Sequence, residues 1–313
     1  MLVVVLPTPP FWFAIAMILL ILCRLVVADT SYLMCEGNIF FWNLGRIKPF
    51  YYFCSQKMDF FMSNRPLILI TNDDGVHAQG ICELTEMMRT LGDVVVVAPD
   101  SARSGSACAI TPLVPVRVSL LDDTLKGLSV YSCSGTPVDC VKLALEKVVP
   151  RKPDLMVSGI NHGDNASVSL HYSGTMGAVL EACMKGVPAI GYSLRTRDPE
   201  CDFSPYRDVV VRVARHVLRE GLREDVCLNV NFPQVPALSG VSVCRMARGI
   251  WQSEWVEDAE PGTYRLTGFF TNLEPDASDT DYWALDHGMA SVTPLTLDMT
   301  SYGDIEGLKS LQK

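Results

Sequence analysis

Apolar residues in the central part of the chain follow two periods. Continuous apolar runs, typical of strands buried on both faces of a sheet, occur at 67–71, 93–98, 154–159, 188–192 and 226–231. Segments with one apolar face, or rich in small residues, predict helices at 80–91, 137–148, 174–185 and 206–220. Further strands are expected at 114–120 and 128–132. This alternation favours an α/β fold, a mostly parallel sheet with helices on both faces.

The pattern changes after about residue 240. Short strand-like pieces carry Trp251, Trp255, Tyr264, Phe269 and Phe270. They predict a β-rich C-terminal appendage, followed by a tail without helices that is free to pack on a partner subunit. We expect this appendage to take part in oligomerisation.

Residues 1–61 do not share the pattern. Residues 1–23 carry no charge and are long enough to span a membrane, but no basic segment precedes them as in a signal peptide. Regular strand–helix alternation begins directly after Met62. We expect 1–61 to be an over-extended gene model, with 62–313 as the functional domain. The alternative is a genuine membrane segment at 1–28.

Composition narrows the class of protein. The net charge of −9 argues against a nucleic-acid surface, which needs a basic face. The 11 cysteines form no CxxC pair and no metal-ligand spacing. Cys140 and Cys227 stand where an apolar residue would serve, so we interpret the cysteines as reduced core residues and expect a cytoplasmic protein.

Adjacent carboxylates follow the first predicted strand, in the turn Asn72-Asp73-Asp74-Gly75. In an open α/β sheet, ligands bind beyond the carboxyl ends of the strands. Carboxylate oxygens suit Mg²⁺, Mn²⁺ or Ca²⁺, and two anions this close are best explained by a cation beside them. A plain hydrophilic turn is the alternative for this segment taken alone.

Polar segments follow other strands as well. The loop 99–105 offers a carboxylate, hydroxyls and a guanidinium, and 158–165 alternates glycines with carboxamides that can approach an anion. Ser173-Gly174-Thr175 opens a predicted helix, which makes it either a phosphate cradle or an ordinary N-cap. His77 and His162 lie in these loops, each as a proton donor to a leaving group or as a plain loop residue.

Several enzyme signatures are absent from the sequence. No dinucleotide-binding Gly-x-Gly-x-x-Gly follows the first strand, no P-loop motif occurs, and no Gly-x-Ser-x-Gly elbow is present. These absences argue against dinucleotide-binding, P-loop and α/β-hydrolase enzymes.

Taken in order, the motifs resemble the SurE family of 5′/3′-nucleotidases. The resemblance covers about 65–300 and rests on segments 70–75 (ITNDDG), 98–105 (APDSARSG), 134–140 (SGTPVDC), 157–163 (VSGINHG) and 172–175 (YSGT). It implies a Rossmann-like core and a homodimer or homotetramer that exchanges a C-terminal segment. The chain departs from the family at Ala107-Cys108-Ala109, where many relatives carry a histidine-containing stretch.

The resemblance also implies a site. One divalent metal ion per subunit, Mg²⁺ or Mn²⁺, would be held by Asp73, Asp74, Ser104 and Asn161. Asn165 and Ser173-Gly174-Thr175 would surround the phosphate. The expected activity is hydrolysis of nucleoside 5′-monophosphates, and of 3′-monophosphates, to nucleoside and phosphate. The nucleophile would be a metal-activated water, so no protein nucleophile is assigned.

Two other functions fit part of the pattern. A non-catalytic anion-binding module would use the same loops without turnover. A phosphatase that forms an aspartyl-phosphate usually separates its aspartates by one residue, whereas Asp73 and Asp74 are adjacent. The nucleoside monophosphate is thus the expected partner, and a membrane becomes one only if 1–28 is translated.

Overall fold

A computed structural model describes residues 32–35, 38–41, 65–198 and 200–312. The chain divides into two compact units, Met1–Met62 and Ser63–Lys313. In the first unit, β1 (Tyr32–Cys35) pairs antiparallel with β2 (Asn38–Phe41), a ladder that the sequence did not suggest. The segment 1–28, for which a membrane span was the alternative to an over-extended gene model, lies outside the described residues. No helix among the described residues is long and apolar enough to cross a membrane.

The second unit is built on a nine-stranded sheet in the order β10-β15-β9-β8-β7-β3-β4-β6-β5. Only the pairs β15–β9 and β5–β6 are antiparallel. Its strands are β3 (Leu67–Thr71), β4 (Asp93–Pro99), β5 (Val118–Asp122), β6 (Leu128–Cys133), β7 (Leu155–His162), β8 (Ala189–Arg195), β9 (Val226–Pro233), β10 (Gly240–Val243) and β15 (Met289–Thr296). The predicted α/β fold is therefore confirmed.

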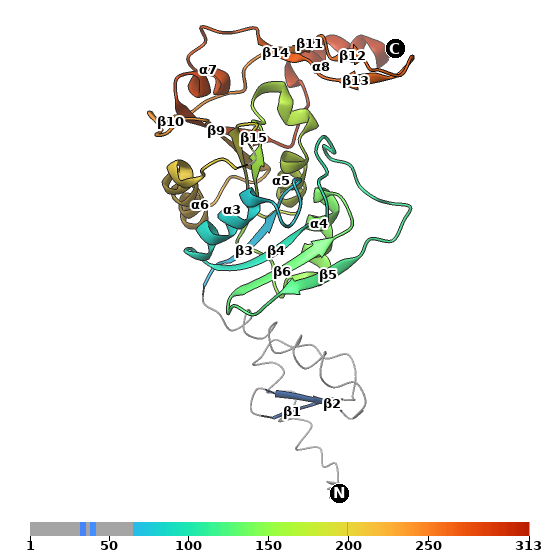
Figure 1. Ribbon diagram of the computed structural model, residues 1–313, viewed down its shortest axis with the longest axis vertical. Helices are drawn as coiled ribbons and strands as arrows, with labels where there is room; N and C mark the ends of the chain where they lie inside the picture. The colour runs from blue at the N-terminus through green and yellow to red at the C-terminus, as the bar shows by residue number, and fades with distance from the viewer. Residues whose placement is uncertain (1–31, 36–37, 42–64, 199, 313) are drawn as a thin grey trace, which may run out of the picture. The chain divides into compact units, whose positions relative to one another are not determined.

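Helices cover both faces of this sheet (Figure 1). The helices α3 (Gln79–Arg89) and α6 (Arg207–Glu220) pack together, and α4 (Pro137–Leu143) packs against α5 (Gly174–Met184) on the other face. One π-helical turn, Ala144–Val148, extends α4, and short 3₁₀ turns lie at Ser167–Tyr172 (η2) and Ser204–Tyr206 (η3). The amphipathic α3 buries Ile81, Leu84 and Met88 against the sheet.

Several predicted strand boundaries were wrong. The strand expected at 114–120 begins only at Val118 and ends at Asp122, and Pro115, which has no N–H to donate to a ladder, lies outside it. The strands expected to end at 192 and 231 continue to Arg195 and Pro233. The strand expected to end at Gly159 continues to His162, with Asn161 and His162 paired to Ser193 and Leu194 of β8. Asn161 and His162 are thus strand residues rather than loop residues.

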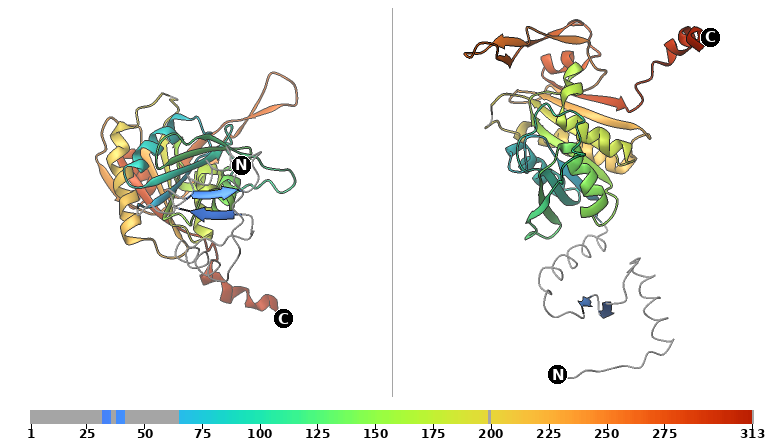
Figure 2. Two further views of the ribbon diagram at one scale, coloured as in Figure 1. Left: turned by 90° about the horizontal axis from the view of Figure 1, so that it is seen from below. Right: turned by 90° about the vertical axis from the view of Figure 1, so that its right-hand side faces the viewer.

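The C-terminal region also differs from the expectation. β10 and β15 join the main sheet, and only 249–272 forms a separate β-rich arm, from β11 (Gly249–Gln252), β12 (Trp255–Glu257), β13 (Tyr264–Leu266) and β14 (Phe269–Asn272). The tail is not without helices, since α7 (Asp281–Asp286) and α8 (Tyr302–Leu308) are present, with a short 3₁₀ turn at Lys309–Gln312. Figure 2 shows α8 beyond an extended segment, and none of its residues is buried.

Candidate metal and phosphate site

The sheet places the candidate residues at the carboxyl ends of its central strands. β3 lies between β4 and β7. The chain continues from β3 to β4 on one side, whereas β7 begins the half of the sheet on the other side, so the strand order reverses next to β3. Such a switch point is the usual ligand site of an open parallel sheet.

The turn after β3 is fixed by Asn72, which is only 1% exposed. Its amide Nδ2 donates to the Gly75 carbonyl at 2.9 Å, and the Gly75 N–H donates back to Asn72 Oδ1 at 3.2 Å. Gly75 has a φ of +105°, a conformation that favours glycine. This turn buries Asp73 and leaves Asp74 half-buried at the end of the sheet.

Asp73 meets the N-terminus of α5. The hydroxyl of the fully buried Thr175 donates to Asp73 Oδ1, and the Thr175 backbone N–H also stabilises this carboxylate. Burial, which the Thr175 hydrogen bonds oppose and the negative charge of Asp74 reinforces, raises the pKa of Asp73 to about 6. The carboxylate is therefore held in place but poorly stabilised as an anion.

Asp74 faces β7. The backbone N–H of His162 donates to Asp74 Oδ2 at 3.4 Å, and the His162 ring Nδ1 lies 3.8 Å from the same oxygen. The neighbouring Asn161 donates its Nδ2 to the Gly163 carbonyl at 2.8 Å. This bond identifies the nitrogen end of the amide, so Asn161 Oδ1 is the end suited to a cation.

The loop after β4 reaches the same turn. The Arg103 N–H donates to the Asp73 carbonyl at 2.7 Å, and the Arg103 guanidinium donates to the Ser134 carbonyl at 3.1 Å. Ser104, the next residue, is exposed. The loop then packs on α5, since a Cβ on Gly177 would lie 2.1 Å from the Ala107 carbonyl oxygen.

An unpartnered hydroxyl lies beside Asp73. The Oγ of Ser106 is buried, without a hydrogen-bond partner in the described part of the chain. A Cβ on Gly174 would lie 2.7 Å from this oxygen and 2.9 Å from Asp73 Oδ2, so both oxygens face one point at the start of α5. A buried polar group without a partner indicates an absent ion, water or ligand.

The donor set fits a hard divalent cation. Adjacent carboxylates, an amide oxygen and hydroxyls are the ligands that Mg²⁺ and Mn²⁺ prefer. Among the described residues, no group of three or more His, Cys, Asp or Glu side chains is arranged so that it could hold a metal ion. A cation here would therefore be held by a mixed oxygen set.

The expected phosphate ligands have structural partners. Ser173 caps α5, with its Oγ accepting the Met176 N–H at 3.1 Å, so the N-cap interpretation of this residue is confirmed. Asn165 is buried, and its Nδ2 donates to Ser193 Oγ at 2.7 Å. Ser173, Gly174 and Thr175 lie next to Asp73, whereas contact of these residues and Asn165 with phosphate stays a prediction.

Other polar groups were not expected from the sequence. Arg195, at the end of β8, donates to Asp164 at 2.9 Å and to Asp286 at 2.6 Å, and stacks 4.4 Å from the Tyr282 ring centroid. The buried Asp281 accepts the Ser167 N–H at 2.8 Å. These contacts join α7 to the loop after β7, and no local motif could have revealed them. His77 is exposed.

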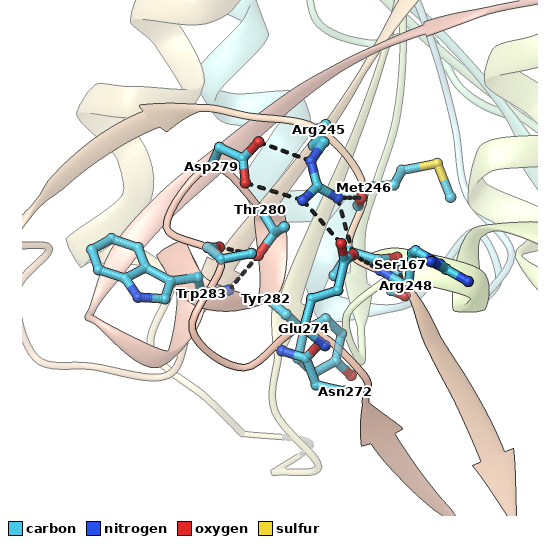
Figure 3. Close-up of polar contacts among 12 residues, drawn as sticks. Ser167, Arg245, Met246, Arg248, Asn272, Glu274, Asp279, Thr280, Tyr282 and Trp283 are labelled. Atoms are coloured by element: carbon cyan, nitrogen blue, oxygen red, sulfur yellow. Dashed lines mark hydrogen bonds and ion pairs between the residues drawn. The ribbon is translucent and has the colours of Figure 1, made fainter.

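Arg245 forms ion pairs at the base of the β-rich arm (Figure 3). Its guanidinium donates to Glu274 at 3.0 Å and to Asp279 at 2.8 Å, while Glu274 also accepts the Arg248 N–H at 2.6 Å. The chain enters the arm just after Arg248 and leaves it just before Glu274. This ion-pair cluster therefore holds both ends of the arm together.

Comparison with known proteins gives a consistent result. The family model described as survival protein SurE matches residues 68–253. Proteins named 5′-nucleotidase SurE match from Bacteroides thetaiotaomicron (51% identical, 79% of this chain, 96% of the relative) and Flavobacterium psychrophilum (44%, 79%, 98%). The crystal structure of the SurE protein from Aquifex aeolicus is 34% identical, with a TM-score of 0.69, covering 79% of this chain and all of that one. On its sequence and its fold alike, the chain belongs to the SurE family.

Proposed function

We propose that this protein is a metal-dependent 5′-nucleotidase, which releases phosphate from nucleoside 5′-monophosphates and, as a lesser activity, from 3′-monophosphates. The observation that carries the proposal is the position of Asp73 and Asp74 in the turn after β3, where Asp73 contacts Thr175 at the start of α5. Relatives that match most of this chain carry the name 5′-nucleotidase SurE.

The proposed metal ligands are Asp73, Asp74, Ser104 and Asn161. A divalent ion bound there supplies a Lewis acid for the phosphoryl oxygens and a water of lowered pKa. Asp73 is oriented by Thr175, and Asp74 by the backbone of His162. We infer that both carboxylates bind the ion, because each already accepts hydrogen bonds that fix it beside its neighbour.

The start of α5 is the proposed position of the phosphate. The positive end of a helix dipole favours an anion. The Thr175 N–H and hydroxyl are directed at Asp73, and the Met176 N–H is directed at Ser173. We therefore expect the substrate to contact Gly174 and the Ser106 hydroxyl at this terminus, with Asn165 at the adjoining ends of β8 and β9.

The experiment is phosphate release from 5′-AMP and 3′-AMP by metal-stripped protein. Activity that EDTA abolishes and Mn²⁺ or Mg²⁺ restores supports the nucleotidase. Nucleotide binding without turnover in either metal would instead indicate a non-catalytic anion-binding module. Capture of a phospho-aspartate during turnover would replace the water nucleophile with Asp73 or Asp74.

Assembly into a homodimer or homotetramer is a further part of the proposal. The exposed side of the C-terminal segment carries Met299, Tyr302, Leu308 and Leu311, which are between 60% and 79% exposed. Exposed apolar side chains at this density mark an interaction surface. Light scattering of the full chain and of a variant ending at residue 297 tests the assembly, since the shorter chain should be the smaller species.

The cytoplasm is the proposed location. The eight cysteines between residues 65 and 312 are free thiols, and six of them are buried. Free thiols are typical of a reducing compartment. Cell fractionation with an antibody to 62–313 tests this location.

A further inference from the structure

Two asparagines of β9 form a closed hydrogen-bonded ring with the main chain of Asn165. The Asn165 N–H donates to Asn231 Oδ1 at 2.7 Å, Asn231 Nδ2 donates to Asn229 Oδ1 at 2.9 Å, and Asn229 Nδ2 donates to the Asn165 carbonyl at 2.8 Å. Asn229 and Asn231 are two residues apart in a strand, so their side chains lie on one face of the sheet. Both are 0% exposed and Asn165 is 6% exposed, so the ring is screened from water.

The polarity of the main chain sets the orientation of both side-chain amides. The Asn165 N–H can only donate, so Asn231 must present its oxygen, and the Asn165 carbonyl can only accept, so Asn229 must present its nitrogen. The remaining nitrogen of Asn231 then meets the remaining oxygen of Asn229, as their 2.9 Å contact shows. One arrangement of the two amides therefore satisfies every hydrogen bond of the ring, and an aspartate at either position would place two oxygens against each other.

The ring satisfies a buried loop and orients it at the same time. Asn165 lies outside the helices and strands, and a buried main chain requires partners for its N–H and carbonyl. β9 supplies both partners from one face, while its other face is apolar, with Leu228, Val230 and Phe232 in the core. Because amide hydrogen bonds are directional, the partners that satisfy the main chain of Asn165 also fix its orientation.

The side chain of Asn165 is held as well. Its Nδ2 donates to the Oγ of the fully buried Ser193 at 2.7 Å. Ser193 lies in β8, paired in register with Asn161 of β7 on one side and with Asn231 of β9 on the other. Asn165 is therefore anchored to β8 and β9, one strand away from the proposed metal ligand Asn161.

We propose that Asn229, Asn231 and Ser193 are positioning residues, which fix the main chain and the side-chain amide of Asn165 so that this amide meets the substrate phosphate in one orientation. The inference rests on the proposed role of Asn165 at the phosphate. Within the described part of the chain, the Asn165 side chain donates only to Ser193. The second N–H of its amide is therefore left to donate to a phosphate oxygen.

The kinetic test is a double-mutant cycle on kcat/KM for 5′-AMP in saturating Mn²⁺. Asn165→Ala removes the side chain but keeps the main-chain N–H and carbonyl, so the ring can still form. We expect Asn165→Ala, Ser193→Ala and Asn231→Ala each to lower kcat/KM by about 10-fold or more. In the Asn165→Ala background, neither Ser193→Ala nor Asn231→Ala should lower it further. Equal losses in both backgrounds would overturn the proposal, because the effect would then not pass through the Asn165 side chain.

Ser291→Ala is the matched control. Ser291 is a buried serine of β15 that is paired in register with Asn231, but its Oγ has no hydrogen-bond partner among the described residues. The substitution therefore removes a buried hydroxyl from the same sheet without removing a contact to Asn165. We expect kcat/KM to stay near the wild-type value. A loss as large as that of Ser193→Ala would contradict a specific role for Ser193.

A readout without substrate separates this inference from the proposed function. Solvent exchange of the Asn165 side-chain amide is followed by NMR of metal-stripped protein labelled with ¹⁵N-asparagine, and the Asn165 signals are those lost in Asn165→Ala. We expect slow exchange in the wild type and in Ser291→Ala, and exchange at least about 10-fold faster in Ser193→Ala and Asn231→Ala.

A protein that hydrolyses no nucleotide can still show this difference, which would refute the proposed function and leave the anchoring of Asn165 in place. Equal exchange rates in the wild type, Ser193→Ala and Asn231→Ala would overturn the positioning role, even in an active nucleotidase. If Asn231→Ala does not fold, Ser193→Ala, which removes a single oxygen atom, decides both tests.

Discussion

Asp73→Asn should stabilise the metal-free protein while it removes the metal site. Burial of Asp73 raises its pKa from 3.8 to about 6, so the folded protein binds this proton more tightly than the unfolded chain. Between these two values stability falls as the pH rises, and above pH 6 the whole cost is present. At 1.36 kcal/mol per pKa unit, the cost is about 3 kcal/mol.

An asparagine at this position carries no charge, and its Oδ1 can still accept from Thr175. We therefore expect Asp73→Asn to exceed the wild type by about 1–3 kcal/mol in free energy of unfolding at pH 7.5. The gain should shrink to about a third at pH 4.5, where the folded carboxyl is protonated but the unfolded one is still largely ionised. The expected gain in the free energy of unfolding is smaller than the full cost of the buried charge, because the new NH₂ group needs a hydrogen-bond partner of its own.

The assay is urea unfolding in EDTA at both pH values, at one protein concentration. Asp208→Asn, on the exposed face of α6, is the matched control and should change stability little at either pH. Saturating Mn²⁺ should stabilise the wild type and leave Asp73→Asn unchanged. An Asp73→Asn protein that is no more stable than the wild type at pH 7.5, or whose gain does not depend on pH, would refute the reasoning.

The remaining predictions concern the supports of the site and the arm. Thr175→Val removes the hydroxyl donor of Asp73 at constant volume, and should weaken Mn²⁺ binding by about 10-fold in calorimetry; an unchanged Kd contradicts this. Gly174→Ala places a methyl group within 3 Å of Asp73 and should reduce kcat by at least about 10-fold, whereas Gly307→Ala, in open space, should not. Arg245→Met should speed proteolysis within 249–272 and leave kcat unchanged; equal cleavage rates would mean that its ion pairs do not hold the arm.

Local sequence patterns were sufficient to predict the strands that are buried along their whole length. β3 and β4 were predicted within one residue because both strands are apolar throughout and buried on both faces. The C-terminal helices were missed for two reasons. α7 is only six residues long, and α8 contains Gly303 and Gly307, which lower helix propensity, and buries no face.

The residues of the site were likewise predictable only in part. Asp73 and Asp74 were predictable because a polar turn directly follows a buried strand. Their partners were not, since Thr175 contacts Asp73 across 102 residues of sequence and the His162 N–H contacts Asp74 across 88. Such pairs arise from the packing of α5 and β7 beside β3, and local sequence periodicity carries no signal of them.

The central claim is that Asp73 and Asp74 hold a metal ion that phosphate release requires. One measurement tests it most directly: the rate of phosphate release from 5′-AMP by wild type, Asp73→Asn and Asp208→Asn, after EDTA treatment and after addition of saturating Mn²⁺. We predict that Mn²⁺ restores the wild type and Asp208→Asn, and that Asp73→Asn stays at least about 100-fold slower while remaining folded. Near-normal turnover by Asp73→Asn in Mn²⁺, or full wild-type activity in EDTA, would contradict the account.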